Sequence, residues 1–261
     1  MDESDVREFN RDAWDKQVEQ NNRWTKPVDQ ETIQRAKSGD FSIVLTPTKP
    51  VPSDWFPPLE GAETLCLASA GGQQAPVLAA AGAKVTVFDN SPKQLKQDRF
   101  VAERDGLKMN FVEGDMADLS TFPDDTFNLV FHPCSNVFVP NILPVWRECY
   151  RVLRSGGTLL AGFTNPLRYI FDDERKENGN LEVRYSLPYS DLEHLDQSHI
   201  QRSIQDGFAL EFGHTLEDQM GGQLMAGFLL SGFYEDRYAS DAKDPLSNFL
   251  DTFIATRAIK P

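Results

Sequence analysis

The chain has 261 residues, 40% of them hydrophobic, which is enough for one large α/β domain with additions. Acidic residues number 40 against 26 lysines and arginines, and no basic run offers a footprint for nucleic acid, so we expect no nucleic-acid partner. No run approaches the roughly 18 apolar residues of a membrane span, and the first residues are acidic and polar without the apolar stretch typical of a signal peptide. We therefore expect a soluble, cytoplasmic protein without a membrane partner.

The first 58 residues predict a helical extension and a connector, ahead of a main domain at 59–261. Residues 4–24 and 29–38 have helical spacing. Trp14 and Trp24 either pin these helices onto the core or form a lid over a ligand, and both interpretations stay open. The prolines between residues 41 and 58 exclude a central strand or a long helix there.

The next stretch predicts a strand, a helix and a second strand. Residues 64–68 are apolar, a turn of small residues follows at 69–72, residues 73–81 are rich in alanine, and 84–88 form a second apolar run that ends on Asp89. Continuous apolar strands of this kind are typical of a parallel sheet covered on both faces. Because an acid at the end of the second strand accepts hydrogen bonds from ribose hydroxyls, we expect a nucleoside ligand.

The alternation continues after Asp89 and predicts a doubly wound sheet. Ser91 is a candidate N-cap with Pro92 at the first helical position, and Gly106 ends that helix. Strands are predicted at 109–112, 127–131 and 158–163, and a helix at 142–153. The third strand is followed by Gly114 and Asp115, and the fourth runs into His132.

Several of these motifs together resemble the class I S-adenosylmethionine-dependent methyltransferases over residues 60–165 and 214–259. They are the small-residue turn, VTVFDNS, EGDMADLSTFPDDTFNLVF and ECYRVLRSGGTLLAG. The resemblance implies a Rossmann-like, seven-stranded sheet, mostly parallel with an antiparallel last strand, and S-adenosylmethionine as the cofactor. It also implies a helix at 215–230 and closing strands at 233–238 and 252–258.

The resemblance also implies a cofactor site. The small-residue turn would hold the methionine end, Asp89 the ribose, and Asp115 with Met116 the adenine. The expected cofactor-binding residues are Ala68, Ser69, Ala70, Gly71, Gln73, Asp89, Asn90, Gln94, Asp115, Met116 and His132.

The turn departs from the family pattern, which begins with an acid and has three alternating glycines. The matching positions here are Cys66, Ala68, Ala70 and Gly72. Alanine adopts negative φ without strain and Gly71 adds a permissive position, so we expect the backbone still to turn. In place of the acid, Gln73, Gln74, a backbone carbonyl or an N-terminal side chain would hold the ammonium group of the cofactor.

Two other functions stay open. A nicotinamide-dependent dehydrogenase shares the glycine turn and the acid, although the full G-x-G-x-x-G is missing here. A methyltransferase-like protein that binds a ligand without catalysis would also explain the altered turn. We expect no metal site, because the histidines are scattered and the three cysteines are not paired as ligands.

The acceptor is expected to bind beside a long insertion at about 165–213. Alternation at 181–187 and at 208–212 predicts a small antiparallel flap there, and the tyrosines predict a small-molecule site. We expect Tyr185, Tyr189 and Asn136 to contact the substrate, and O- or N-methylation rather than C-methylation. His132 and His214 are candidate proton acceptors, with a structural role equally open for each. A homodimer is left open.

Overall fold

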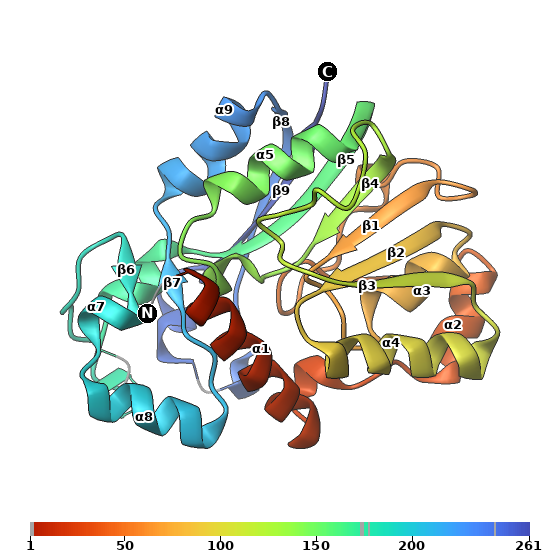
Figure 1. Ribbon diagram of the computed structural model, residues 1–261. Coiled ribbons are helices and arrows are strands. Elements are labelled where there is room, and N and C mark those ends of the chain that lie inside the picture. The colour runs from red at the N-terminus through yellow and green to blue at the C-terminus, as the bar shows by residue number, and fades with distance from the viewer. Residues whose placement is uncertain (1–2, 173–174, 177, 243) are drawn as a thin grey trace.

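The computed structural model describes residues 3–172, 175–176, 178–242 and 244–261, and it contains a seven-stranded sheet in the order β3-β2-β1-β4-β5-β9-β8 (Figure 1). The strands are β1 (Glu63–Leu67), β2 (Lys84–Asp89), β3 (Met109–Glu113), β4 (Phe127–His132), β5 (Leu153–Thr164), β8 (Leu229–Asp236) and β9 (Phe253–Ile259). The first five strands are parallel, and β9 runs antiparallel to both β5 and β8. The Rossmann-like topology predicted from the sequence is confirmed.

Helices cover both faces of this sheet. One core packs α2 (Gln30–Lys37), α3 (Gln74–Ala80) and α4 (Pro92–Asp105) with the connector, and the other packs α5 (Leu143–Val152) and α9 (Gly222–Ala226). The predicted cap of α4 is present, because the Ser91 side chain accepts a hydrogen bond from the Gln94 N–H and Gly106 ends the helix in a left-handed conformation. No helix in the described ranges is long and apolar enough to cross a membrane.

The C-terminal elements differ in their bounds from the prediction. A π-helical turn at Glu217–Gly221 precedes α9, which ends at Ala226 and not near residue 230. Gly227, at φ 110°, adopts the left-handed conformation that ends a helix, so Leu229 and Leu230 belong to β8. The helix predicted over 215–230 was therefore too long at its C-terminal end.

The inserted segment, residues 165–213, contains the predicted two-stranded antiparallel sheet, but of the predicted strand residues only Phe212 belongs to it. Its strands are β6 (Tyr189–Ser190) and β7 (Phe212–Gly213), and the helices α7 (Asp191–His194) and α8 (Gln197–Asp206) lie between them. Residues 181–187 form only an isolated bridge, between Val183 and Phe171. Val183 is 65% exposed, so the alternating pattern there does not face a core, and the strand prediction was wrong.

Helix α1 (Glu3–Glu19) lies between α4 and the inserted segment (Figure 1). On one side Asp15 accepts hydrogen bonds from the Ser91 hydroxyl at 2.6 Å and from the Lys93 N–H at 3.1 Å. On the other side Gln17 donates to the carbonyl of Gly207 at 2.6 Å. Because α1 contacts both α4 and the inserted segment, it fixes the distance between these two parts.

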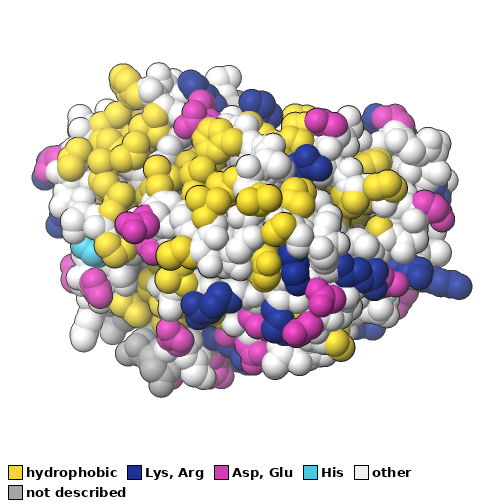
Figure 2. All heavy atoms as spheres, turned by 90° about the horizontal axis from the view of Figure 1, so that it is seen from above, with side chains coloured by type: hydrophobic (Ala, Val, Ile, Leu, Met, Phe, Trp, Pro, Cys, Tyr) yellow, Lys and Arg dark blue, Asp and Glu magenta, His cyan; other side chains and the backbone are white. Residues whose placement is uncertain are grey.

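Some large hydrophobic side chains remain exposed near the last strands. Figure 2 looks down on the molecule from above and shows hydrophobic side chains gathered over much of that face. In α9 and β8 the exposed ones are Leu224, Met225, Leu229 and Phe233. A homodimer and the domain boundary at residue 58 stay predictions.

We expect Asn10→Ala to loosen the inserted segment from α1. The Asn10 amide is almost fully buried, donates to the carbonyls of Phe138 and Leu210 at 3.0 and 3.1 Å, and accepts from the Leu210 N–H at 2.7 Å. Leaving these groups unpaired should lower the free energy of unfolding by about 1–3 kcal/mol, measured by urea denaturation. Asp12→Ala, an exposed position on the same helix, should change it by less than about 1 kcal/mol. Equal losses in both variants would contradict this role.

Candidate functional site

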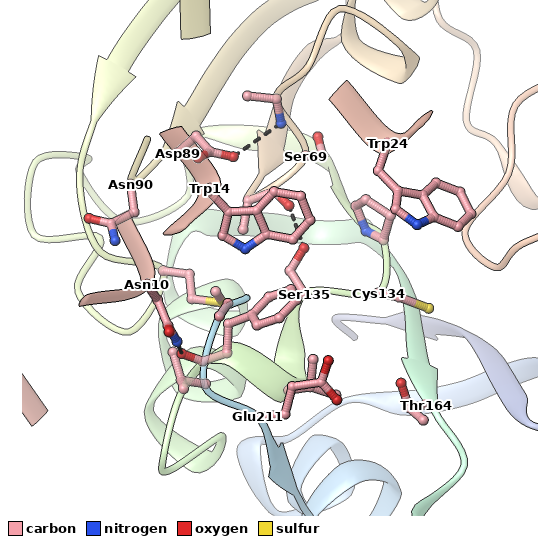
Figure 3. Close-up of a pocket in the computed structure, with 18 of the residues that line it drawn as sticks. Asn10, Trp14, Trp24, Ser69, Asp89, Asn90, Cys134, Ser135, Thr164 and Glu211 are labelled. Carbon is pink, nitrogen blue, oxygen red and sulfur yellow. Dashed lines mark hydrogen bonds between the residues drawn. The ribbon is translucent and has the colours of Figure 1, made fainter. Parts of the chain in front are cut away.

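A cavity of about 430 Å³ opens where the parallel strands β1, β2 and β4 end. Helix α1 covers it, and the connector, the loop after β4 and the inserted segment complete its wall. Figure 3 shows Trp14 between Asp89 and Ser135, with Glu211 and Thr164 at the opposite end of the view from Asp89. The cavity therefore has one end at the carboxyl ends of β1 and β2 and another beside the inserted segment.

The loop after β1 has an unusual backbone. Gly71 and Gly72 have φ values of 122° and 76°, and Ala68 has a φ of 46°, in the left-handed region that disfavours a side chain. The expectation that the alanines would keep negative φ is therefore wrong at Ala68. Hydrogen bonds hold this residue from both sides, because its N–H donates to the Phe88 carbonyl at 2.8 Å and its carbonyl accepts from the Ser135 hydroxyl at 2.5 Å. Strain of this kind persists where surrounding contacts impose it, often at ligand sites.

Asp89 ties the end of β2 to this loop. Its carboxylate accepts from the Ala70 N–H at 3.1 Å and from the Ser91 N–H at 2.9 Å. Burial raises the pKa of Asp89 to about 6, although these backbone hydrogen bonds favour the ionised form. The acid thus lines the cavity with a fixed orientation, as a partner for ligand hydroxyl groups requires.

A second buried carboxylate lies behind the loop. Asp98, on α4, accepts from the Gly71 N–H at 2.7 Å through Oδ2, while its Oδ1 has no hydrogen-bond partner. Burial raises the pKa of Asp98 to about 7. The Oε1 atom of Gln94, one turn earlier and in the cavity wall, is also buried without a partner. Two unsatisfied acceptors beside one loop are unusual in a protein interior and indicate a missing donor.

Helix α1 contributes the cover of the cavity through one stripe of residues. Each of these lining residues lies three or four positions from another, so that they share one face of the helix: Glu3, Val6, Arg7, Asn10, Trp14 and Gln17. Arg7 and Asn90 exchange two hydrogen bonds across the edge of the site, and the Trp14 ring packs edge-on against Phe138 with centroids 5.2 Å apart. Both Trp14 and Trp24 line the cavity, as the lid interpretation requires.

The end beside the inserted segment is rich in polar side chains. Tyr169 donates a hydrogen bond to Glu211 at 2.7 Å, and Arg168 pairs with Asp244 at 3.2 Å while its guanidinium lies 5.6 Å from the centre of the Tyr238 ring. Burial and the neighbouring Glu211 carboxylate raise the pKa of Tyr169 well above its ordinary value. Tyr169 therefore stays a hydrogen-bond donor near neutral pH.

Most of the expected cofactor residues line the cavity. They are Ala68, Ser69, Ala70, Gln73, Asp89, Asn90, Gln94, Asp115 and Met116. Gly71 does not line it, because the carbonyl of Trp24 and the Gln94 side chain cover it closely: a Cβ at Gly71 would lie 2.9 Å from each. Gln73 uses its amide to donate to the carbonyls of Arg23 and Lys26, at 2.9 and 3.1 Å. These roles in binding remain predictions.

The two histidines lie elsewhere than the sequence suggested. His132 is fully buried, with Nδ1 2.9 Å from the Leu67 carbonyl and Nε2 against the amide of Asn136, and His214 Nε2 lies 3.0 Å from the Asn136 carbonyl. Burial lowers the pKa of both rings. Neither histidine nor Asn136 lines the cavity, so their positions favour the structural interpretation.

Tyr185 and Tyr189, expected at the substrate, lie behind the cavity wall. Tyr189 stacks on Tyr169 with ring centroids 5.3 Å apart, and Tyr185 packs against Tyr189 at the same separation. Of these three tyrosines, Tyr169 alone lines the cavity. Sequence reasoning missed Thr164, Arg168 and Glu211 as lining residues. The helical spacing of the α1 lining residues could have indicated that they share one face. Several of them are polar, however, so a search for apolar periodicity does not find them.

Comparisons with known proteins agree with this geometry. A family model described as a methyltransferase domain matches residues 65–161. The chain is 53% identical over 251 residues to a Bacillus subtilis protein named uncharacterized methyltransferase YbaJ, covering 96% of this chain and 97% of that protein. It belongs to the class I S-adenosylmethionine-dependent methyltransferases. This methyltransferase is thus an enzyme whose cofactor is S-adenosylmethionine, and the dehydrogenase alternative is not supported.

Two further matches are more distant. A sterol 24-C-methyltransferase of Aspergillus fumigatus is 33% identical to the methyltransferase over 119 residues, which cover 45% of this chain and 31% of that enzyme. The crystal structure of an S-adenosylmethionine-dependent methyltransferase from Mesorhizobium loti matches with a TM-score of 0.61 and 18% identity, covering 79% of this chain and 94% of that one. The match to the Mesorhizobium loti structure shows that the two proteins share a fold.

The residues present fit the cofactor. Asp89 lies at the end of β2, where it can accept hydrogen bonds from ribose hydroxyls, and Asp115 and Met116 line the neighbouring wall, where the adenine is expected. The unpartnered Gln94 oxygen offers an acceptor to an ammonium group of the methionine end. These residues would bind and orient the cofactor, which would supply the methyl group.

We expect Asp89→Ala to weaken S-adenosylmethionine binding by about 5- to 150-fold, the equivalent of about 1–3 kcal/mol for donors left without a partner. Isothermal titration calorimetry measures the effect. Asp118→Ala, at an acid whose own carboxylate contact is the Ser120 N–H at 2.9 Å and which lies outside the cavity, is the control. Wild-type affinity in Asp89→Ala would place the ribose elsewhere.

The buried acids also predict a pH dependence of stability. Because burial raises the pKa values of Asp89 and Asp98 to about 6 and about 7, the folded protein binds more protons than the unfolded chain between about pH 4 and these values. The free energy of unfolding from these two groups therefore falls as pH rises through that window.

Asp98→Asn tests this dependence, since it keeps an acceptor for the Gly71 N–H but cannot ionise. We expect the variant to gain stability relative to the wild type between about pH 5 and about pH 8, in urea denaturation of both proteins without ligand. A difference between the two proteins that is the same at every pH would show that Asp98 does not titrate in this range.

Proposed function

We propose that this methyltransferase transfers the methyl group to an oxygen or nitrogen atom of a small polar acceptor. The acceptor would bind at the end of the cavity lined by Thr164, Tyr169 and Glu211. The observation that carries the proposal is a covered cavity in which a carboxylate and a phenol lie beyond the expected cofactor position.

The size and cover of the cavity support a small acceptor. Its volume of about 430 Å³ falls within the range of small-molecule sites, about 300–1,000 Å³, and the cofactor itself must occupy part of it. Helix α1 and the inserted segment face each other across it, joined by the hydrogen bonds of Asn10 and Gln17. A folded macromolecule would have to part these elements to reach the site.

The polar groups support O- or N-methylation. Methyl transfer requires the acceptor to lie in line with the sulfonium methyl at near-attack distance, with water excluded. A hydroxyl or amine acceptor also loses a proton, and Glu211 is a carboxylate in the cavity wall that accepts hydrogen bonds. Tyr169, which stays protonated, fixes the orientation of that carboxylate. A carbon acceptor without polar hydrogens would not form the hydrogen bond to Glu211 that orients a hydroxyl or amine.

His132 and His214 are left out of the proposal. Each ring is hydrogen-bonded inside the protein, outside the cavity wall, and burial lowers its pKa. The similarity to the Aspergillus fumigatus sterol enzyme covers less than half of the chain, so it does not identify the acceptor.

The test is a screen of small hydroxyl- and amine-containing metabolites for formation of S-adenosylhomocysteine. We expect Glu211→Gln to lower kcat/KM for any accepted substrate by about 100-fold, while S-adenosylmethionine binds within about twofold of wild type. Glu193→Gln, an exposed acid on α7 in the same segment, is the matched control and should keep full activity.

Full turnover in Glu211→Gln would remove this carboxylate from the mechanism. Activity confined to a protein or nucleic-acid substrate would overturn the small-molecule proposal altogether.

A further inference from the structure

Asp98 is a carboxylate that the proposed chemistry does not use, although it is the most buried acid near the site. It is 0% exposed on α4, below the loop between β1 and α3. One oxygen accepts the Gly71 N–H at 2.7 Å, and the other has no partner. A buried carboxylate normally has its remaining lone pairs satisfied or a cation beside it, because an unpaired buried charge costs several kcal/mol.

No direct cationic partner of Asp98 is present among the described residues. In the described ranges, no lysine or arginine forms an ion pair with Asp98 or with Asp89. The titratable groups that face Asp98 are Cys66 on β1 and Asp89 on β2, and Asp15 on α1 in turn faces Asp89. Burial raises the pKa of the Cys66 thiol, so this group stays neutral and contributes no charge. Among the described residues, the two acids that hold this loop are therefore not neutralised by a direct ion pair, and their ionised forms place negative charge behind it.

Negative charge behind the loop affects cofactor and product differently, because the reaction changes the charge of the cofactor. S-adenosylmethionine carries a sulfonium and is one unit more positive than S-adenosylhomocysteine, in which the sulfur has lost its methyl group and become a neutral thioether. Inside a protein, a unit charge several ångströms away is worth more than in water, because the effective dielectric constant is lower. An acid behind the loop therefore distinguishes the two ligands without touching either.

We propose that Asp98 is a positioning residue that holds Gly71 in the ligand-binding conformation, and that its negative charge makes the site prefer the sulfonium cofactor over its neutral product. The loop geometry supports the first part, since Gly71, at φ 122°, is packed between the Gln94 side chain and the Trp24 carbonyl and its N–H is directed to Asp98. The lack of a cationic partner for Asp98 among the described residues supports the charge preference. The family pattern has an acid where this chain has Cys66, and the sequence did not show which residue replaces it. Asp98 lies close enough to Cys66 to raise the pKa of its thiol, so α4 supplies a carboxylate near that position.

Two substitutions separate the hydrogen bond from the charge. Asp98→Asn keeps an oxygen to accept the Gly71 N–H and removes only the charge, whereas Asp98→Ala removes both. Glu103→Gln is the matched control, because it removes one negative charge from an exposed position on the same helix. Isothermal titration calorimetry of each protein with S-adenosylmethionine and with S-adenosylhomocysteine, at about pH 8 where Asp98 with its raised pKa of about 7 is mostly ionised, gives both affinities without any acceptor. The result is thus independent of the proposed methyl acceptor.

We expect Asp98→Asn to weaken S-adenosylmethionine binding at least threefold more than S-adenosylhomocysteine binding, roughly the effect of one charge at several ångströms in a medium of intermediate dielectric constant. Asp98→Ala should weaken both ligands further, and Glu103→Gln should match the wild type. Thermal unfolding of each protein without ligand confirms that it is folded.

Other results would overturn the proposal. Equal weakening of both ligands in Asp98→Asn would exclude the charge preference, and wild-type affinities in both Asp98 variants would exclude the positioning role as well. If Asp98→Ala does not fold, the comparison of the two ligands in Asp98→Asn still decides the charge preference, and its affinities for both ligands decide whether position 98 matters.

Discussion

The cavity depends on how the backbone after β1 is held by two buried carboxylates. Asp89, at the end of β2, accepts the Ala70 N–H, and Asp98, on α4, accepts the N–H of the next residue, Gly71. Consecutive backbone donors are thus bound from two elements, which keeps the loop turned away from the strand and leaves space above it. Neither acid has a cationic partner among the described residues, so the site is prepared for a ligand that brings donors or positive charge.

Helix α1 makes this space a closed site. It contacts the N-terminus of α4 through Asp15 and the inserted segment through Asn10 and Gln17, so a single helix bridges the two ends of the cavity. Trp14, on the same helix, lies in the cavity wall between those contacts. In the proposed arrangement, cofactor and acceptor would share one cover, and the exclusion of water that methyl transfer needs would depend on α1 remaining in place.

The buried histidines support the site from behind. His132, Asn136 and Gln219 form a chain of side-chain contacts, in which the Asn136 amide donates to Gln219 at 2.8 Å, and His214 bonds to the Asn136 backbone. This network connects the end of β4 with the π-helical turn before α9. Buried hydrogen-bonded side chains restrict one another, so these residues help to determine where the loop after β4, with Ser135, can contact Ala68.

The sequence by itself determined the sheet, the helices around it and the cofactor end of the site, because these depend on local patterns. Apolar runs determine the buried strands, and Ser91 and Gly106 determine the ends of α4. Asp89 ends a parallel strand, so it lies at the carboxyl edge of the sheet whatever the position of that strand in the sheet. The tertiary structure alone decided which side chains face the cavity at the acceptor end. His132 was a candidate on the chain and Glu211 was not, yet packing buried the first in a network and placed the second in the cavity wall. The left-handed Ala68, the α1 cover and the carboxylate of Asp98 beside Cys66 likewise depend on contacts between residues far apart in sequence, which no local periodicity records.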